Sequence, residues 1–304
     1  MSKLRVSVVE YLNTAPLVWG FTHGPLEGEY ELSFTVPSLC AEALRKREAD
    51  VAILPAIEVQ RVEGLVVLPE LAIASKQRVR SLLLIAKKPM GEARRVALDA
   101  SSRSTQALVK ILCQRHWNTA PEYLEATPDL GEMLERADAA LVIGDPALRL
   151  AIGIEGRSRT GPSGEQICDG AAAGVSGAGT LHVYDVVEEW NRLTNLPAVL
   201  AVWAGWPEKL TPRVAADFLA SAEYGFLHIE EICASASPKL GLPAAVLETY
   251  LRENIDYALS GASRSGLELY FQLAAEQGLI AGARALRWVG AGVKAEAAPA
   301  AARG

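Results

Sequence analysis

Short apolar segments alternate with longer amphipathic segments along most of this chain. The apolar segments are bounded by Gly, Pro or polar residues and predict buried β-strands at 4–9, 50–54, 65–69, 79–86, 95–98, 139–143 and 198–203. Between the strands expected at 95–98 and 139–143, one amphipathic helix is expected. Its residues on one face recur with the helical period: Ser104, Ala107, Leu108, Ile111 and Leu112. Because strands that alternate with helices form sheets covered by helices, the pattern predicts an α/β fold.

Two breaks in composition predict how the chain is divided. Its 304 residues are enough for about two domains. The segment Lys-Lys-Pro-Met-Gly at 87–91 follows an expected strand, and Leu196-Pro197 precede another, so each is a candidate crossover between lobes. The expected division is residues 1–88 with 198–289 in lobe 1 and residues 89–197 in lobe 2. Such a discontinuous plan leaves a ligand cleft between the lobes.

The rest of the chain is expected to contain helices and two irregular segments. Residues 153–179 are rich in Gly and show no helical period, which predicts a long loop. Residues 290–304 form an Ala-rich tail that we expect to be loosely held. The last third before the tail is expected to be mostly helical, at 212–225, 244–258 and 263–278.

Charge and composition exclude several classes of function. Lys and Arg total 30 against 36 Asp and Glu, a net charge of −6, so no basic face is expected and nucleic acid is not an expected partner. The four Cys and four His are scattered, which argues against a metal site. Residues 4–9 alternate like a strand where a signal peptide needs an unbroken apolar run, and no later run is long enough to span a membrane. We therefore expect a cytoplasmic protein with no membrane partner.

Polar residues follow three of the expected strands, at 10–14, 99–105 and 144–146, where helices are expected to begin. In an open α/β sheet such junctions lie at the carboxyl ends of strands, where ligands bind, and helix starts favour anions. The alternative is purely structural. Ser and Thr before a helix are ordinary caps, Asp145-Pro146 is typical of an N-cap and first helical residue, and Asn13 is as typical of a turn as of a ligand contact.

Two of the polar segments exceed what local structure needs. Within residues 101–105, Ser-Ser-Arg-Ser-Thr, only one side chain can take the cap position, so the remaining hydroxyls are free to face a cleft. Arg80-Ser81, inside the strand expected at 79–86, likewise places polar side chains where they are available to a cleft. Its alternative interpretation is an alternating strand with Arg80 facing solvent.

Several short motifs, in order along almost the whole chain, resemble the chorismate dehydratase family of the futalosine route to menaquinone. They are Tyr11-Leu12-Asn13-Thr14-Ala15-Pro16-Leu17, the segment 50–58, Val79-Arg80-Ser81, the Ser/Thr cluster after Asp99, the segment 143–148, Tyr184-Asp185 with Glu189-Trp190, Thr194-Asn195-Leu196-Pro197, Ala201-Val202-Trp203 and Gly266-Leu267-Glu268-Leu269. The chain departs from the family where 153–179 is longer and richer in Gly, and where Asn195 replaces a common Gly.

The resemblance implies a two-lobed fold like a type II periplasmic binding protein, with the ligand cleft between the lobes. It also implies a hydro-lyase of menaquinone biosynthesis that removes water from its small-molecule substrate, chorismate, without a cofactor or a metal. The product would be 3-[(1-carboxyvinyl)oxy]benzoate. Two alternatives stay open, since fold alone does not define function. One is the sister dihydroxynaphthoate-forming synthase, which relies on a His where this chain has Asn13, and the other is a non-catalytic cytoplasmic small-molecule binding protein.

If the chain is such a dehydratase, its polar residues divide into three roles. Asn13 is the expected catalytic residue, orienting the substrate and hydrogen-bonding the departing hydroxyl. Glu58 is a candidate general base, although a solvated helix residue is its ordinary interpretation and the enolpyruvyl carboxylate of the substrate is an alternative base. The expected substrate-binding residues are Ser102, Ser104 and Thr105 for one carboxylate, Ser81 and Arg80 for the other, and Thr14 and Asp145 along the cleft.

Overall fold

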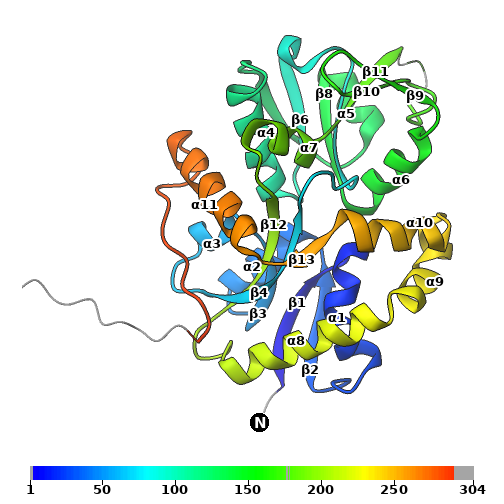
Figure 1. Cartoon of the computed structure of the whole chain (residues 1–304). Coiled ribbons are helices and arrows are strands. Elements are labelled where there is room, and N and C mark those ends of the chain that lie inside the picture. Colours follow the sequence, from blue (N-terminus) through cyan, green and yellow to red (C-terminus); the bar gives the residue numbers. More distant parts are fainter. Residues whose placement is uncertain (1–2, 176, 178, 291–304) are drawn as a thin grey trace, which may run out of the picture.

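Two mixed β-sheets organise the computed structural model, which describes residues 3–175, 177 and 179–290 (Figure 1). The first sheet and its helices form the lower lobe in Figure 1 and come from both ends of the chain. Its elements are β1 (Leu4–Val9), η1 (Leu12–Thr14), α1 (Ala15–His23), β2 (Tyr30–Thr35), α2 (Pro37–Arg45), β3 (Val51–Pro55), α3 (Glu58–Arg61), β4 (Val66–Ser75), β12 (Ala198–Gly205), α8 (Pro212–Leu227), α9 (Ile229–Leu240), α10 (Ala244–Thr249), η3 (Tyr250–Asn254), β13 (Asp256–Ala258) and α11 (Gly261–Glu276).

The second sheet comes from the middle of the chain and forms the upper lobe in Figure 1. Its elements are β5 (Leu82–Ala86), η2 (Met90–Glu92), β6 (Arg95–Asp99), α4 (Arg103–Arg115), β7 (Glu122–Ala126), α5 (Leu130–Arg136), β8 (Ala139–Ile143), α6 (Gly144–Ile154), β9 (Ser158–Thr160), β10 (Gln166–Asp169), β11 (Thr180–Asp185) and α7 (Val186–Thr194). The α/β class expected from the sequence is confirmed.

The strand order shows where the chain passes between the sheets. The first sheet has the order β13-β4-β12-β3-β1-β2, and the second has the order β7-β6-β8-β5-β11-β10-β9. Because β5 pairs with β8 and β11, the first passage lies at 76–81, ahead of the crossover expected at 87–91. The chain returns between α7 and β12, at 195–197. The segment 76–81 therefore joins the lobes, and Arg80 and Ser81 precede the strand in which they were expected.

Two other expectations about local structure were wrong. Residues 153–179 are not one long loop, because β9 and β10 form an antiparallel hairpin that extends the second sheet beyond β11. The single helix expected at 244–258 is three elements: α10 ends at Thr249, a π-helix follows as η3, and β13 then pairs with the edge of β4. The expected tail lies outside the described residues, except for Gly290.

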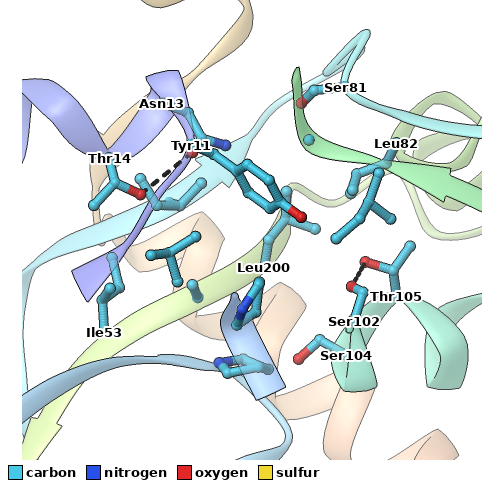
Figure 2. Close-up of a pocket in the computed structure, with 17 residues that line it drawn as sticks. Tyr11, Asn13, Thr14, Ile53, Ser81, Leu82, Ser102, Ser104, Thr105 and Leu200 are labelled. Carbon is cyan, nitrogen blue, oxygen red and sulfur yellow. Dashed lines mark hydrogen bonds between the residues drawn. The ribbon is translucent and has the colours of Figure 1, made fainter. Parts of the chain in front are cut away.

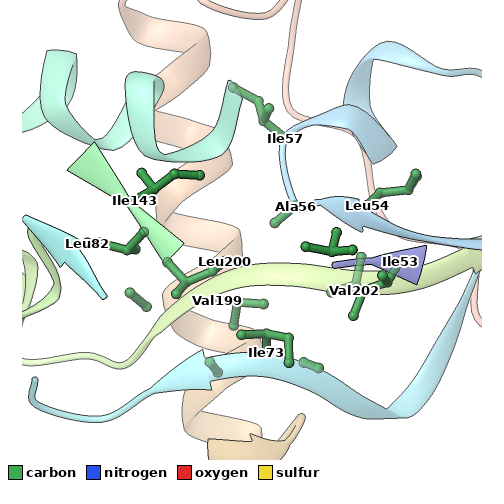
Figure 3. Packing of buried hydrophobic residues seen from close by; sticks show 14 of the residues in the cluster. Ile53, Leu54, Ala56, Ile57, Ile73, Leu82, Ile143, Val199, Leu200 and Val202 are labelled. Carbon is green, nitrogen blue, oxygen red and sulfur yellow. The ribbon is translucent and has the colours of Figure 1, made fainter. Parts of the chain in front are cut away.

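One apolar core runs through both lobes beneath the cleft. Leu82 and Ile143 of the second sheet belong to the same buried cluster as Ile53, Ile73 and Leu200 of the first sheet (Figure 3). A second cluster lies on the opposite face of the second sheet, where Leu83 and Ile85 alternate with Leu82 and Leu84. Strands buried on both faces explain why the sequence shows continuous apolar runs there. Among the described residues, no helix is long and apolar enough to cross a membrane.

Candidate active site

A cavity of about 60 Å³ lies between the two lobes, and polar side chains from both lobes face it (Figure 2). Its polar lining residues follow β1 and β6 or precede β5, and its other lining residues include members of strands β3, β4, β8 and β12, so the cavity lies between strands of both sheets. Its floor is apolar, formed by residues such as Ile53, Leu82 and Leu200. None of the described residues that line it is charged; its polar lining residues are Tyr11, Asn13, Thr14, Ser81, Ser102, Ser104 and Thr105.

Asn13 lies in η1, a single 3₁₀ turn between β1 and α1. The Thr14 hydroxyl donates a hydrogen bond to Asn13 Oδ1 over 3.4 Å, which directs the amide nitrogen of Asn13 into the pocket (Figure 2). The backbone N–H of Leu12 donates to Asp145 Oδ1 over 3.1 Å, so a carboxylate of the other lobe holds the turn. Asn13 and Thr14 therefore both face the pocket, as expected from the sequence.

Asp145 supports this turn instead of lining the cavity as expected. The helix α6 begins two residues earlier than expected, at Gly144, with Ile143 in the cap position, so Asp145 is not the N-cap. Burial raises the pKa of Asp145 above its ordinary value, and the hydrogen bond from Leu12 opposes that rise. Its contact joins the second lobe to the first directly beside Asn13.

Tyr11 projects into the pocket between the two lobes (Figure 2), and no role was expected for its side chain from the sequence. A Cβ atom at Gly144 would lie 2.6 Å from the Tyr11 ring, so only glycine lets the ring pack against the start of α6. Gly144 also has φ +66, a backbone conformation that side chains strain. Burial raises the pKa of Tyr11 to about 12, so its hydroxyl stays protonated at neutral pH.

The start of α4 forms the opposite wall of the pocket. Ser102 occupies the cap position, but its hydroxyl donates to Thr105 Oγ1 over 2.8 Å and caps no N–H group. Ser104 Oγ accepts a hydrogen bond from the backbone N–H of Ile57, 3.0 Å away in the first lobe. No described residue accepts from the backbone N–H groups of 103–105. One residue of the cluster, Ser102, does take the cap position, but it makes no capping hydrogen bond, and the free amides are available to an anion.

Ser81 faces the pocket from the segment that joins the lobes, whereas Arg80 does not. The Arg80 guanidinium is buried and pairs with Glu155, so it neither faces solvent nor binds a ligand in this cavity. Arg80 has φ +64, an uncommon conformation for a residue with a side chain. The N–H groups of Val79 and Arg80 both donate to Asp185 Oδ2, over 3.1 and 2.6 Å, which stabilises this conformation.

Asp185 is a buried carboxylate that fixes the 79–81 segment and also starts a helix. Its other oxygen, Oδ1, accepts hydrogen bonds from the N–H groups of Val187 and Glu188 at the start of α7. Burial raises the pKa of Asp185 to about 6, although the four N–H donors favour the charged form. The sequence motif Tyr184-Asp185 indicated the family but did not show that Asp185 would position Ser81.

Glu58 is neither a solvated helix residue nor part of the cavity lining. Its side chain is fully buried and does not line the pocket. Three guanidinium groups pair with it: Arg45 at 2.7 Å, Arg61 at 2.9 Å and Arg103 at 3.1 Å. Since Arg103 belongs to α4, this cluster holds the start of α4 against the first lobe, and Glu58 is a structural anion.

A larger groove of about 460 Å³ lies on the other side of Tyr11, between α1 and α9. Its lining is mainly apolar, and its charged members are Glu10, Asp145 and Lys239. Its two carboxylates outnumber its one lysine, which disfavours an anion there. The smaller cavity is therefore the better candidate for an anionic ligand, because its donors come from both lobes and are all neutral.

Known structures share this two-lobed architecture. A crystal structure of an Archaeoglobus fulgidus protein has a TM-score of 0.64 at 17% identity, covering 91% of this chain and 98% of that protein. The periplasmic aliphatic sulphonate binding protein SsuA of Escherichia coli has a TM-score of 0.60 at 16% identity, covering 93% of this chain and 90% of that chain. The chain thus has a periplasmic-binding-protein-like fold, as expected.

A curated relative and a family profile connect the chain with a pathway. A chorismate dehydratase of Thermus thermophilus is 27% identical over 262 residues, which are 86% of this chain and 91% of the relative. The profile of a family described as menaquinone biosynthesis matches residues 4–276. Every motif that indicated the resemblance lies inside that range. The resemblance is confirmed, and the chain belongs to the menaquinone biosynthesis family.

Proposed function

We propose that this protein is a chorismate dehydratase, a hydro-lyase that converts chorismate to 3-[(1-carboxyvinyl)oxy]benzoate and water. The relative from Thermus thermophilus carries that activity in its name. The observation that carries the proposal is the placement of the Asn13 amide opposite the open start of α4, across one cavity. An amide donor and a set of free N–H groups suit a substrate with a leaving hydroxyl and carboxylates.

The charge of the protein makes local binding groups necessary. Chorismate carries two carboxylates, and the chain has a net charge of −6, so the overall field does not attract the substrate. The amides of 103–105 with the Thr105 hydroxyl would bind one carboxylate, and Ser81 would bind the other. Hydrogen bonds to charged groups contribute about 1.5–3 kcal/mol each, so a few neutral donors are sufficient.

The proposed chemistry needs little acid or base strength from the protein. The enolpyruvyl carboxylate of the substrate takes the proton from ring C3, and the electrons of that bond delocalise through the ring double bond toward the ring carboxylate. The C4–O bond then breaks, the hydroxyl leaves with the proton as water, and the ring becomes aromatic. Asn13 donates a hydrogen bond to the departing oxygen. Holding the reacting groups in position supplies the remaining acceleration.

The cavity describes a closed state of this cycle. Its volume of about 60 Å³ holds a few water molecules and is too small for chorismate. The substrate would therefore enter when the lobes separate. Closure would then exclude water and bring Asn13 and Ser81 toward α4.

The sister synthase is less well supported by the lining of the cavity. The notable difference between the two activities is a His in the first lobe, and none of the described residues that line this cavity is a His. Asn13 occupies the comparable turn. We therefore propose the dehydratase alone.

The direct test is to incubate the purified protein with chorismate and follow ultraviolet absorbance and product mass. The proposal predicts a product lighter than chorismate by one water, with no added cofactor. A matched reaction with the Asn13→Asp variant provides the control for spontaneous loss of water. If chorismate stays unchanged while calorimetry shows that it binds, the protein is a non-catalytic binding protein and the proposal is wrong.

A further inference from the structure

Tyr250 lies behind the pocket wall and has no part in the functions assigned above. It is 1% exposed and is the first residue of the π-helix η3, in the lobe opposite Ser81. Its hydroxyl donates a hydrogen bond to Ser81 Oγ over 2.9 Å. A π turn widens a helix locally and is frequent at functional sites, and here it begins at the residue that contacts the pocket wall.

The hydrogen bond from Tyr250 determines what Ser81 can do. A serine hydroxyl has one hydrogen, and an oxygen that accepts the hydrogen of Tyr250 directs its own hydrogen elsewhere. No other described residue hydrogen-bonds to Ser81 Oγ. The Ser81 carbonyl is also fixed, because it accepts from the Gly144 N–H over 2.8 Å. Since Ser81 lines the cavity, its hydrogen is left for a ligand there.

Tyr250 is also close to Asn13. Burial raises the pKa of Tyr250 above its usual value, and its contacts with Ser81 and Asn13 oppose that rise. The hydroxyl is therefore protonated at neutral pH and lies beside both side chains.

We propose that Tyr250 is a positioning residue that makes the Ser81 hydroxyl a donor to a carboxylate of the bound substrate. The inference rests on the proposed function. It adds a buried residue, from the lobe opposite Ser81, that touches no substrate and acts through Ser81.

A double-mutant cycle separates this role from a merely structural one. Tyr250→Phe is expected to lower kcat/KM about tenfold, and Ser81→Ala about thirtyfold, as for lost hydrogen bonds to a charged group. If Tyr250 acts through Ser81, adding Tyr250→Phe to Ser81→Ala changes kcat/KM by less than about twofold. A double variant whose kcat/KM falls by the product of the two single-variant factors would contradict the proposal.

The matched control is Tyr257→Phe, seven residues away in β13. The buried hydroxyl of Tyr257 has no hydrogen-bond partner among the described residues, so its removal is expected to leave kcat/KM within about twofold of the wild type. A tenfold loss in this variant would show that any Tyr→Phe change near η3 disturbs the site, and would contradict a specific role for Tyr250.

A second measurement covers the case in which Tyr250→Phe does not fold. In a crystal structure of the wild type with 3-[(1-carboxyvinyl)oxy]benzoate, Ser81 Oγ should lie within hydrogen-bond distance of both Tyr250 and a ligand carboxylate. A Ser81 hydroxyl that contacts Tyr250 but no carboxylate would overturn the inference. A wild-type protein that leaves chorismate unchanged rejects the proposed function, and the inference with it. An active wild type with additive variants rejects only the role of Tyr250.

Discussion

The two ends of the pocket use different means to present their donors. At the α4 end, the donors are the backbone amides of a regular helix with the hydroxyls of Ser104 and Thr105, and the Ser102 hydroxyl donates to Thr105. At the other end, Asn13 and Ser81 are side-chain donors whose directions depend on Thr14, Asp145, Tyr250 and Asp185. One end therefore binds through local backbone geometry, whereas the other depends on contacts between distant parts of the chain.

The first way to break this comparison is to change Asn13 itself. Asn13→Asp replaces a donor with an anion beside a doubly charged substrate, and we expect kcat/KM to fall about a thousandfold. Steady-state kinetics with chorismate measures this. Asn118→Asp adds the same charge at an exposed residue outside the cavity and should stay near wild type. Near-normal kcat/KM for Asn13→Asp would reject its assigned role.

A smaller effect is expected at the contact between Tyr11 and α6. Gly144→Ala puts a methyl group where the Tyr11 ring lies and strains a residue at φ +66, so kcat/KM should fall about thirtyfold. Gly153→Ala is the matched control, because the same helix offers open space there and alanine favours a helix. Equal kinetics for the two variants would show that the position of Tyr11 does not matter.

The support of Ser81 by Asp185 predicts a pH dependence. As the pH falls below about 6, Asp185 takes up a proton and loses acceptor capacity for the N–H groups of Val79 and Arg80, so kcat/KM should fall about tenfold. Asp185→Asn should show that loss at every pH and lack this acidic limb. Asp138→Asn removes a carboxylate that accepts from two N–H groups outside the pocket. This variant should keep the acidic limb of the pH profile.

The sign of the stability effect separates this loss from unfolding. Because the pKa of Asp185 is raised, the folded protein binds that proton more tightly than the unfolded chain. This group therefore increases the free energy of unfolding as the pH falls from above 6 toward its ordinary pKa. Thermal unfolding at each pH provides the check. If the Asp185→Asn variant keeps the acidic limb, another group causes it.

The smallest effect is expected at the α4 end. Thr105→Ala removes one hydroxyl and leaves the backbone amides in place, so KM should rise about threefold with little change in kcat. Thr105→Ser, which keeps the hydroxyl, should restore the wild-type KM. A loss as large as that of Asn13→Asp would show that side chains dominate at both ends, and the comparison between the ends would be wrong.

Local patterns predicted the strands and the polar turns, but not the partners of the side chains. The strand at 139–143 and the helix start after Ser102 follow from apolar runs and hydroxyl residues close in sequence. The burial of Arg80 and Glu58 could not be predicted, because Glu155 and three arginines approach them only in the folded chain. Tyr250 had no sequence signal, since its function depends on a residue 169 positions away.

The passage between the lobes shows the same limit. The run at 79–86 predicted a strand, but the chain needs residues 76–81 to cross between the sheets, and the strand begins only at Leu82. Burial of Arg80 with a positive φ requires Asp185, more than a hundred residues later in the sequence. The local sequence pattern around a residue therefore predicted its secondary structure better than its role in the site.

The position of a bound ligand tests the central claim most directly. In a crystal structure with 3-[(1-carboxyvinyl)oxy]benzoate, the account predicts the ligand between the lobes, with one carboxylate on the amides of 103–105 and Asn13 Nδ2 directed at the ring carbon that carried the hydroxyl. A ligand in the groove between α1 and α9, or an Asn13 amide turned away from the ligand, would contradict it.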